Sequence, residues 1–216
     1  MGKITAIRDG RGRSERVNVF IDGEFAFGLE AEVVVQERLR VGQELSASQT
    51  EDLNRSGFFR RCLEAALRYL SYRPRSELEV RERLQRRGFN DSSVDAVMAR
   101  LREQGLVDDT AFAQFWKANR ESFSPRSQRL TKLELRQKGI ADDIIDRVAD
   151  MVNDDESAYR AAQDKARSLP LSDYQGFKRR LGGYLKRRGF NYGVINHTVK
   201  RMWQEVGGRF EDGILS

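Results

Sequence analysis

The segment 73–76, Arg-Pro-Arg-Ser, begins a sequence unit that this chain repeats. A basic stretch follows it and ends in Leu-Gln-Arg-Arg-Gly at 84–88. The second copy starts with Ser-Pro-Arg-Ser at 124–127 and ends at 135–139, and a third ends at 185–189. The final glycines lie 51 and 50 residues apart. A fixed period of this length is typical of stacked helical repeats, which favours an extended binding protein over an enzyme built around one pocket.

Apolar positions recur at fixed distances from these glycines. Val94, Ile145 and Ile195 lie six residues after them, and Leu101, Val152 and Met202 lie thirteen after them. We therefore predict a mainly α fold of three tandem three-helix units at 58–105, 106–153 and 154–206, nine helices in all, followed by a C-terminal tail at 207–216. Helices are expected to start at Asn90/Asp91, at Asp108-Asp109 and at Asp142, since Asn and Asp favour N-terminal caps.

The first 57 residues have a different pattern, which predicts a small β-rich module. Val17, Val19 and Ile21 alternate with other residues, Asp22-Gly23 is a hairpin-turn dipeptide, and Phe25, Phe27 and Leu29 alternate on the return strand. The other expected elements are a strand at Lys3–Arg8, a turn at Asp9–Arg13, a helix at Glu30–Arg38, a turn or strand at Val41–Leu45 and a helix at Ser48–Ser56. The module ends near Gly57, and it either caps the first helix pair or adds a contact to a partner.

Composition narrows the function. Residues 1–55 hold 8 basic and 10 acidic side chains (net −2), and the remainder holds 31 and 23 (net +8). A basic array indicates a polyanion or an acidic protein as partner. One cysteine and one histidine, and no run of 18 apolar residues, indicate a soluble cytoplasmic protein.

Basic side chains are the strongest candidates for a binding site. Between Asp173 and Glu205 there is no acid, but eight bases occur: Lys178, Arg179, Arg180, Lys186, Arg187, Arg188, Lys200 and Arg201. The equivalent stretches hold Arg81, Arg83, Arg86 and Arg87 with Glu79 and Glu82, and Arg126, Arg129, Lys132, Arg136 and Lys138 with Glu134. Stacked units would align these three basic helices as a stripe that binds phosphates or an acidic protein groove. A merely solvated helix face is the alternative.

No set of residues suggests catalysis, a metal or a cofactor. Cys62 lies in an apolar stripe and is expected in the core. His197 is expected on the surface or against an anion, and the Asp pairs are better explained as helix starts than as metal ligands. Trp116, Tyr72 and Trp203 could stack on bases, but their helical spacing favours the core. We therefore expect a protein that is not an enzyme.

The linked motifs resemble the RecX family of regulatory proteins. The resemblance covers roughly residues 58–206. It is carried by Arg75-Ser76-x-x-Glu79 to Arg87-Gly88-Phe89, Gly105-Leu106-Val107-Asp108-Asp109-x-x-Phe112-Ala113-x-x-Trp116, Glu134-Leu135-x-x-Lys138-Gly139-Ile140 and Arg188-Gly189-Phe190. It implies a non-catalytic regulator that binds RecA filaments on single-stranded DNA, limits their growth, and lowers recombinase, ATPase and LexA-cleavage activities. We also expect the protein to be a monomer.

Two other functions stay open. A general DNA-binding repeat protein without a recombinase partner, on single- or double-stranded DNA, would use the same bases. A metal-dependent phosphoryl-transfer enzyme would need an acid cluster opposite the basic helices, which the sequence lacks. Whether filament ends or the filament groove would be bound is not encoded in any motif.

Overall fold

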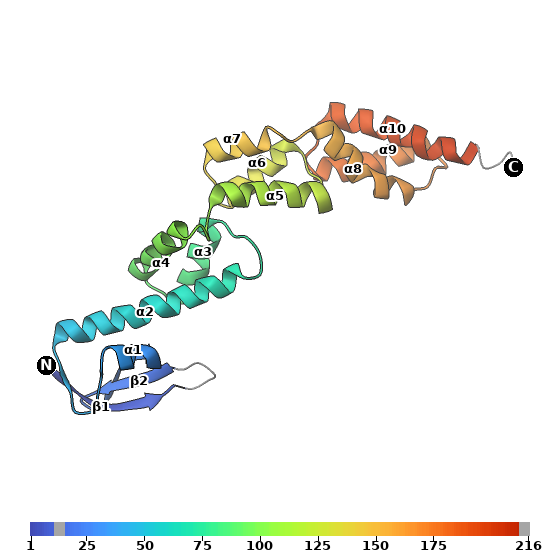
Figure 1. Cartoon of the computed structure of the whole chain (residues 1–216). Coiled ribbons are helices and arrows are strands. Elements are labelled where there is room, and N and C mark those ends of the chain that lie inside the picture. The colour runs from blue at the N-terminus through green and yellow to red at the C-terminus, as the bar shows by residue number, and fades with distance from the viewer. Residues whose placement is uncertain (11–15, 212–216) are drawn as a thin grey trace. The chain divides into compact units, whose positions relative to one another are not determined.

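The computed structural model describes residues 1–10 and 16–211, with side chains described up to Gly207. Within this part of the chain lie four strands and ten helices, so the fold is mainly helical with a small N-terminal sheet, as predicted (Figure 1). The chain divides into two compact units. The first comprises Met1–Arg73 and Glu79–Val107, and the second comprises Pro74–Leu78 and the chain from Asp108 onward.

The N-terminal module is an antiparallel sheet in the order β3-β2-β1-β4. Its strands are β1 (Gly2–Asp9), β2 (Arg16–Ile21), β3 (Glu24–Glu30) and β4 (Glu44–Leu45). Asp22 and Gly23 have φ of 50° and 89°, which confirms the predicted hairpin turn between β2 and β3. The expected turn at Asp9–Arg13 falls mostly on residues 11–13, outside the described part.

The alternation expected on the return strand is wrong at Phe25. The β2–β3 register shifts between Val19 and Phe20, so Val19 pairs with Phe27 while Phe20 pairs with Phe25. This bulge turns Phe25 away from the core, where it is 58% exposed and its ring meets that of Phe20. Phe27 and Leu29 remain buried.

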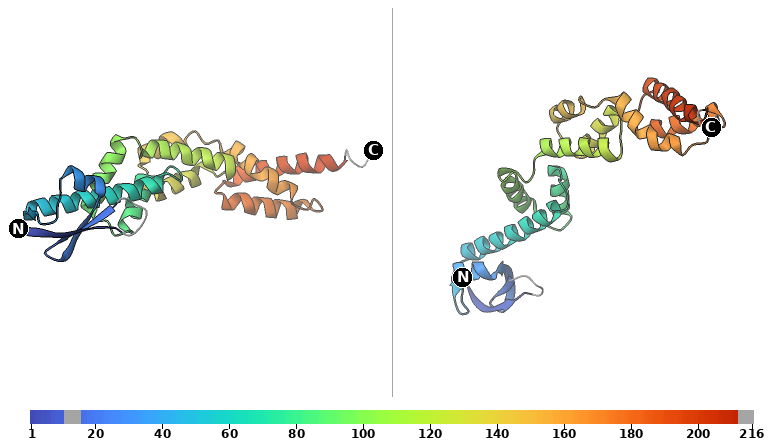
Figure 2. Two further views of the ribbon diagram at one scale, coloured as in Figure 1. Left: turned by 60° about the horizontal axis from the view of Figure 1, so that its bottom comes forward. Right: turned by 45° about the vertical axis from the view of Figure 1, so that its right-hand side comes forward.

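The predicted break between two helices near Gly57 is also wrong. After the short helix α1 (Ala31–Gln36), one helix, α2 (Ala47–Leu70), runs through this position without interruption. Gly57 is buried, and a Cβ added there would lie 2.5 Å from the carbonyl oxygen of Gly28 on β3. The glycine therefore allows α2 to pack closely on the sheet, along which it lies in Figures 1 and 2.

The first repeat consists of the C-terminal part of α2, α3 (Glu77–Gln85) and α4 (Asp91–Glu103). Asn90 caps α4 by accepting a hydrogen bond from the backbone amide of Ser93, as predicted. Its core contains Cys62, Val80, Leu84, Val94, Val97, Met98 and Leu101. The thiol of Cys62 is fully buried, and burial raises its pKa to about 11.

The second and third repeats follow the same plan. The second holds α5 (Asp109–Phe123), α6 (Gln128–Gln137) and α7 (Asp142–Ala149), and the third holds α8 (Asp154–Arg167), α9 (Tyr174–Arg187) and α10 (Tyr192–Glu211). Two boundaries differ from prediction. Val152 lies beyond the end of α7 and is only partly buried, and α10 continues to Glu211 instead of ending at Val206.

One hydrogen bond recurs between neighbouring segments of the second unit. The backbone amide of Gln128, at the start of α6, donates to the carboxylate of Asp154, the first residue of α8, over 2.7 Å. The amide of Glu77 donates in the same way to Asp109, the first residue of α5, over 2.8 Å. Each bond satisfies an N-terminal amide that a helix cannot satisfy itself. We call these two contacts the joints.

Candidate nucleic-acid interface

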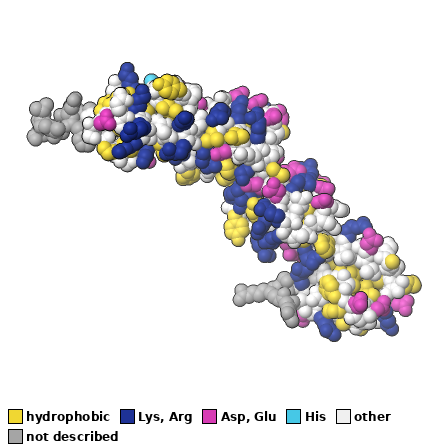
Figure 3. Space-filling model, turned by 180° about the vertical axis from the view of Figure 1, so that it is seen from behind, with side chains coloured by type: hydrophobic (Ala, Val, Ile, Leu, Met, Phe, Trp, Pro, Cys, Tyr) yellow, Lys and Arg dark blue, Asp and Glu magenta, His cyan; other side chains and the backbone are white. Residues whose placement is uncertain are grey.

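Helix α9 presents its bases because its other face is fixed in the core. Asp173 caps the helix by accepting hydrogen bonds from the amides of Gln175 and Gly176. Phe177, Leu181 and Leu185 are buried at helical spacing. The remaining half of the helix therefore holds the basic side chains. On the face seen in Figure 3, Lys and Arg side chains gather over the C-terminal repeat.

Within the described part of the chain, five of the six predicted α9 bases have no acidic partner. Among the described residues, no carboxylate lies within 4.0 Å of Lys178, Arg179, Arg180, Lys186 or Arg187. All but Lys178 are exposed. An uncompensated positive surface of this kind attracts anions and loses affinity for them as salt rises. We call these five residues the α9 patch.

Arg188 has a different role. Its guanidinium lies 4.4 Å from the ring centroid of Tyr184 and donates to the hydroxyl oxygen of Ser124 over 2.9 Å. Its carbonyl oxygen accepts a hydrogen bond from the amide of Ser127. Arg188 thus connects the end of α9 to the start of α6, and its side chain takes part in the contact between the second and third repeats.

The bases of α6 are largely neutralised, which the sequence did not reveal. Lys132 Nζ lies 2.7 Å from Asp146 and 2.9 Å from Asp150, and hydrogen bonds to these acids raise the pKa of Lys132. The same bond to Lys132 lowers the pKa of Asp146. The other contacts are Arg126 to Glu134 at 3.0 Å, Arg136 to Asp142 at 2.8 Å and Lys138 over the Trp116 ring at 5.2 Å. Arg129 is exposed.

The α3 bases lie in three different environments. Arg83 packs over the ring of Tyr69, with its Nε buried. Arg86 pairs with Glu82 one helical turn away, at 3.5 Å. Arg87 is exposed and lines a cavity of the first unit. The α6 and α9 helices are connected at their ends, and the alignment of all three as one stripe stays a prediction.

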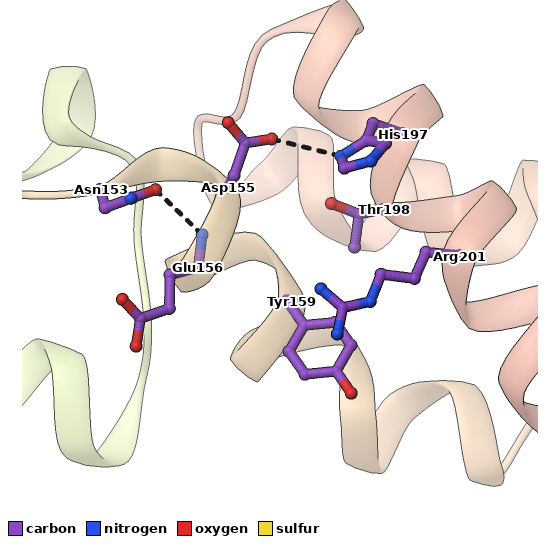
Figure 4. A pocket seen from close by; sticks show the side chains of 7 residues that line it. All are labelled: Asn153, Asp155, Glu156, Tyr159, His197, Thr198 and Arg201. Carbon is purple, nitrogen blue, oxygen red and sulfur yellow. Dashed lines mark hydrogen bonds and ion pairs between the residues drawn. The ribbon is translucent and has the colours of Figure 1, made fainter.

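On α10, Lys200 is exposed, whereas Arg201 contacts neighbouring side chains. Arg201 pairs with Glu205 at 2.9 Å and stacks over Tyr159 at 3.8 Å. His197 is exposed and lies 3.4 Å from Asp155, at the rim of a shallow pocket shown in Figure 4. This position agrees with the prediction that His197 lies on the surface.

The aromatic residues considered for base stacking differ in their surroundings. Trp116 donates a hydrogen bond to Glu134, and Trp203 packs against Tyr174 and Phe177. Tyr72, expected in the core, is 79% exposed. No group of three or more His, Cys, Asp or Glu side chains that could hold a metal ion occurs in the described residues. None of the described helices combines the length and apolar character needed to cross a bilayer.

The carboxyl groups near helix starts act in several ways. Asp108 accepts hydrogen bonds from the amides of Thr110 and Ala111, as expected of a cap. Asp142 does not cap α7, whose N-cap is Ala141, and instead pairs with Arg136. Burial raises the pKa of Asp109, opposed by the hydrogen bond from the Glu77 amide.

Four domain models of one known protein family match successive segments of the chain. The models of the regulatory protein RecX N-terminal domain and of the first, second and third RecX three-helix domains match residues 2–46, 62–101, 108–148 and 153–199.

Related sequences and solved structures point to the same family as these models. A regulatory protein RecX of Clostridium beijerinckii is 31% identical over 207 residues, covering 94% of this chain and 96% of the relative. Another, of Chlorobaculum tepidum, is 37% identical over 147 residues, covering 68% and 91%. A crystal structure of regulatory protein RecX aligns with a TM-score of 0.62 at 25% identity, covering 92% of this chain and 98% of that one. That of RecX from Lactobacillus salivarius supports the fold alone, with a TM-score of 0.57 at 23% identity, covering 68% and 97%. With all four domain types present in order, this chain belongs to the RecX family of regulatory proteins.

Proposed function

We propose that this chain binds RecA filaments on single-stranded DNA and limits their growth, thereby lowering the recombinase, ATPase and LexA-cleavage activities of RecA. Membership of the RecX family supports a regulatory role related to RecA. The observation that carries the DNA part is the α9 patch, in which five bases lack any carboxylate within 4.0 Å in the described part of the chain.

Phosphate binding follows from this charge. Each base that neutralises a phosphate of single-stranded DNA releases counterions and contributes about 0.7 to the slope of log K against log salt. Five such contacts would give a slope near −3.5, on the order of a hundredfold loss of affinity between 50 and 200 mM salt. Three tandem repeats also allow several weak contacts to one polymer to act together, because each contact raises the effective concentration of the next.

The first experiment measures ATP hydrolysis by RecA on single-stranded DNA with this protein added well below one copy per RecA. A progressive fall is expected, because a protein acting on a growing filament end is needed in fewer copies than the filament has subunits. Absence of an effect even at equal copies and low salt would overturn the RecA proposal.

A matched pair of variants tests the α9 patch. Lys186→Gln with Arg187→Gln removes two unpaired charges and is expected to reduce the salt slope of DNA binding by about 1.4. Arg136→Gln with Arg147→Gln removes the same charge, but both arginines already pair with aspartates at 2.8 and 3.3 Å. This control is expected to keep most of its DNA affinity. Equal effects of the two pairs would remove the patch from the proposal.

The same variants separate the alternative function. A general DNA-binding protein would lose DNA affinity and any effect on RecA in the same proportion, and it would act on other strand-coating proteins. If RecA inhibition survives while affinity for naked DNA falls, direct contacts with RecA dominate.

A further inference from the structure

A second concentration of unpaired arginines lies in the first unit. Arg16, Arg61, Arg68 and Arg87 line a cavity of about 350 Å³ together with Glu64 and Phe89. These side chains come from separate segments that the fold brings together. Arg16 begins β2, Arg61 and Arg68 lie at i and i+7 on one face of α2, and Arg87 follows the end of α3.

Within the described residues, this cavity is only partly neutralised by the protein itself. Among the described residues, none of the four guanidinium groups has a carboxylate within 4.0 Å. Glu64 is the single acid in the lining, and it shares a hydrogen bond with Glu30, which pairs in turn with Arg60. Desolvation, and then this bond to Glu30, raise the pKa of Glu64, while attraction by Arg16 and Arg68 partly opposes the rise. The lining therefore carries a net positive charge of about three or more.

The surroundings of Arg61 favour an anion in this cavity. Its guanidinium stacks over the ring of Phe58 at 4.3 Å, and its Nε is buried without a hydrogen-bond partner. Burial, and then repulsion by Arg16, lower the pKa of Arg61. Bringing like charges together in this way is electrostatically unfavourable, and an anion among them would reverse that effect.

We propose that this cavity binds a phosphate group of a nucleic-acid backbone. Arginine presents a planar fork of N–H donors that matches phosphate oxygens, and Arg68 and Arg87 are exposed at the surface where a strand can reach them. The N-terminal module supplies Arg16, so it contributes to binding in addition to covering α2. This site rests on the nucleic-acid part of the proposed function, and it requires no recombinase.

The test measures binding of the full chain to a fluorescein-labelled oligo-dT by anisotropy between 50 and 200 mM salt, without RecA. Arg68→Gln with Arg87→Gln is expected to weaken binding at 50 mM salt by at least about tenfold. It is also expected to make the salt slope shallower by about 1.4, the value for two phosphate contacts. Arg55→Gln with Arg100→Gln is the control, because both arginines belong to the same unit but pair with Glu51 and Glu103. Circular dichroism verifies that each variant is folded.

A variant with the opposite effect excludes a purely structural explanation. Glu64→Gln removes the acid from the lining and is expected to tighten oligo-dT binding. If the arginine pair and its control bind alike, or if Glu64→Gln weakens binding, the site is overturned.

Inorganic phosphate distinguishes the source of the phosphate group. Binding of inorganic phosphate is measured at constant ionic strength for the wild type and for the Arg68→Gln, Arg87→Gln variant. If phosphate binds only the wild type while both proteins bind oligo-dT equally, the cavity is a site for free phosphate. That result would overturn the nucleic-acid assignment. The outcomes also separate the two proposals. If the arginine variant loses oligo-dT affinity but the wild type does not inhibit RecA, the phosphate site is supported and the proposed function is not. If the wild type inhibits RecA but the variant keeps the wild-type salt slope for oligo-dT, the proposed function is supported and the phosphate site is not.

Discussion

Gly189→Ala is expected to destabilise the second unit by far more than a glycine in a turn normally costs. Gly189 has a φ of 89°, a conformation that costs an alanine about 1–2 kcal/mol. A Cβ at this position would also lie 2.5 Å from Ser127 Oγ and 2.8 Å from Leu130 Cβ. Because Leu130 Cβ is attached directly to α6, the helices must separate, and overpacking of this kind costs about 1–3 kcal/mol more. The total is about 2–5 kcal/mol.

Gly88→Ala is the matched control. Gly88 ends its basic stretch in the same way, with a φ of 84°, but no atom lies within 4 Å of an added Cβ. The expected loss is therefore only the conformational cost of about 1–2 kcal/mol. Gly139→Ala, whose Cβ would lie 2.7 Å from Leu78 Cβ, is expected to resemble Gly189→Ala.

Urea denaturation measures these free energies of unfolding. The chain has two tryptophans, Trp116 and Trp203, and both lie in the second unit, so their fluorescence follows that unit. Far-UV circular dichroism follows the Gly88 variant. A loss for Gly189→Ala no larger than that for Gly88→Ala would refute the argument that close contact between repeats, and not φ alone, requires the glycine.

Three further outcomes are expected. The Cys62 thiol, with its pKa raised to about 11, should not react with a disulfide reagent at pH 8 until urea unfolds the chain. Since an unfolded thiol ionises near pH 8.5, stability should also fall as the pH rises from there toward 11. Asp109→Asn keeps an acceptor for the Glu77 amide and should match or exceed wild-type stability at pH 7, by urea denaturation. Because burial raises the pKa of Asp109, that advantage should disappear as the pH falls toward about 4. Gly57→Ala should lower the free energy of unfolding by about 1–2 kcal/mol, because the clash with the Gly28 carbonyl outweighs the better helix propensity of alanine; unchanged stability would contradict the close packing of α2 on β3.

The repeat architecture could be predicted because it depends on local signals. Helix starts at Asn90 and Asp108 and the hairpin at Asp22-Gly23 are encoded within a few neighbouring residues. The break predicted at Gly57 failed because sequence alone cannot distinguish a glycine that ends a helix from one that allows close packing. The alternation predicted for Phe25 failed for a similar reason, because the bulge opposite Phe20 depends on the pairing of two strands and not on one strand alone.

The candidate site could be predicted only in part. Counting acids within a stretch selected the α9 patch correctly as unpaired, because no acid lies near it in sequence. The same count failed for α6, where Asp146 and Asp150 reach Lys132 from the next helix. The arginine cavity was missed altogether, because Arg16, Arg61 and Arg87 are brought together only by the fold.

The two joints give the second unit a direction. In each joint the carboxylate comes from the C-terminal neighbour and the amide from the N-terminal one, so the two partners are not interchangeable. A duplicated copy of the second repeat inserted before the third would offer Asp109 to one side and the Gln128 amide to the other. Such a duplication would recreate both hydrogen bonds without any further substitution. The number of repeats in the array is therefore open to change by whole-unit gene duplication.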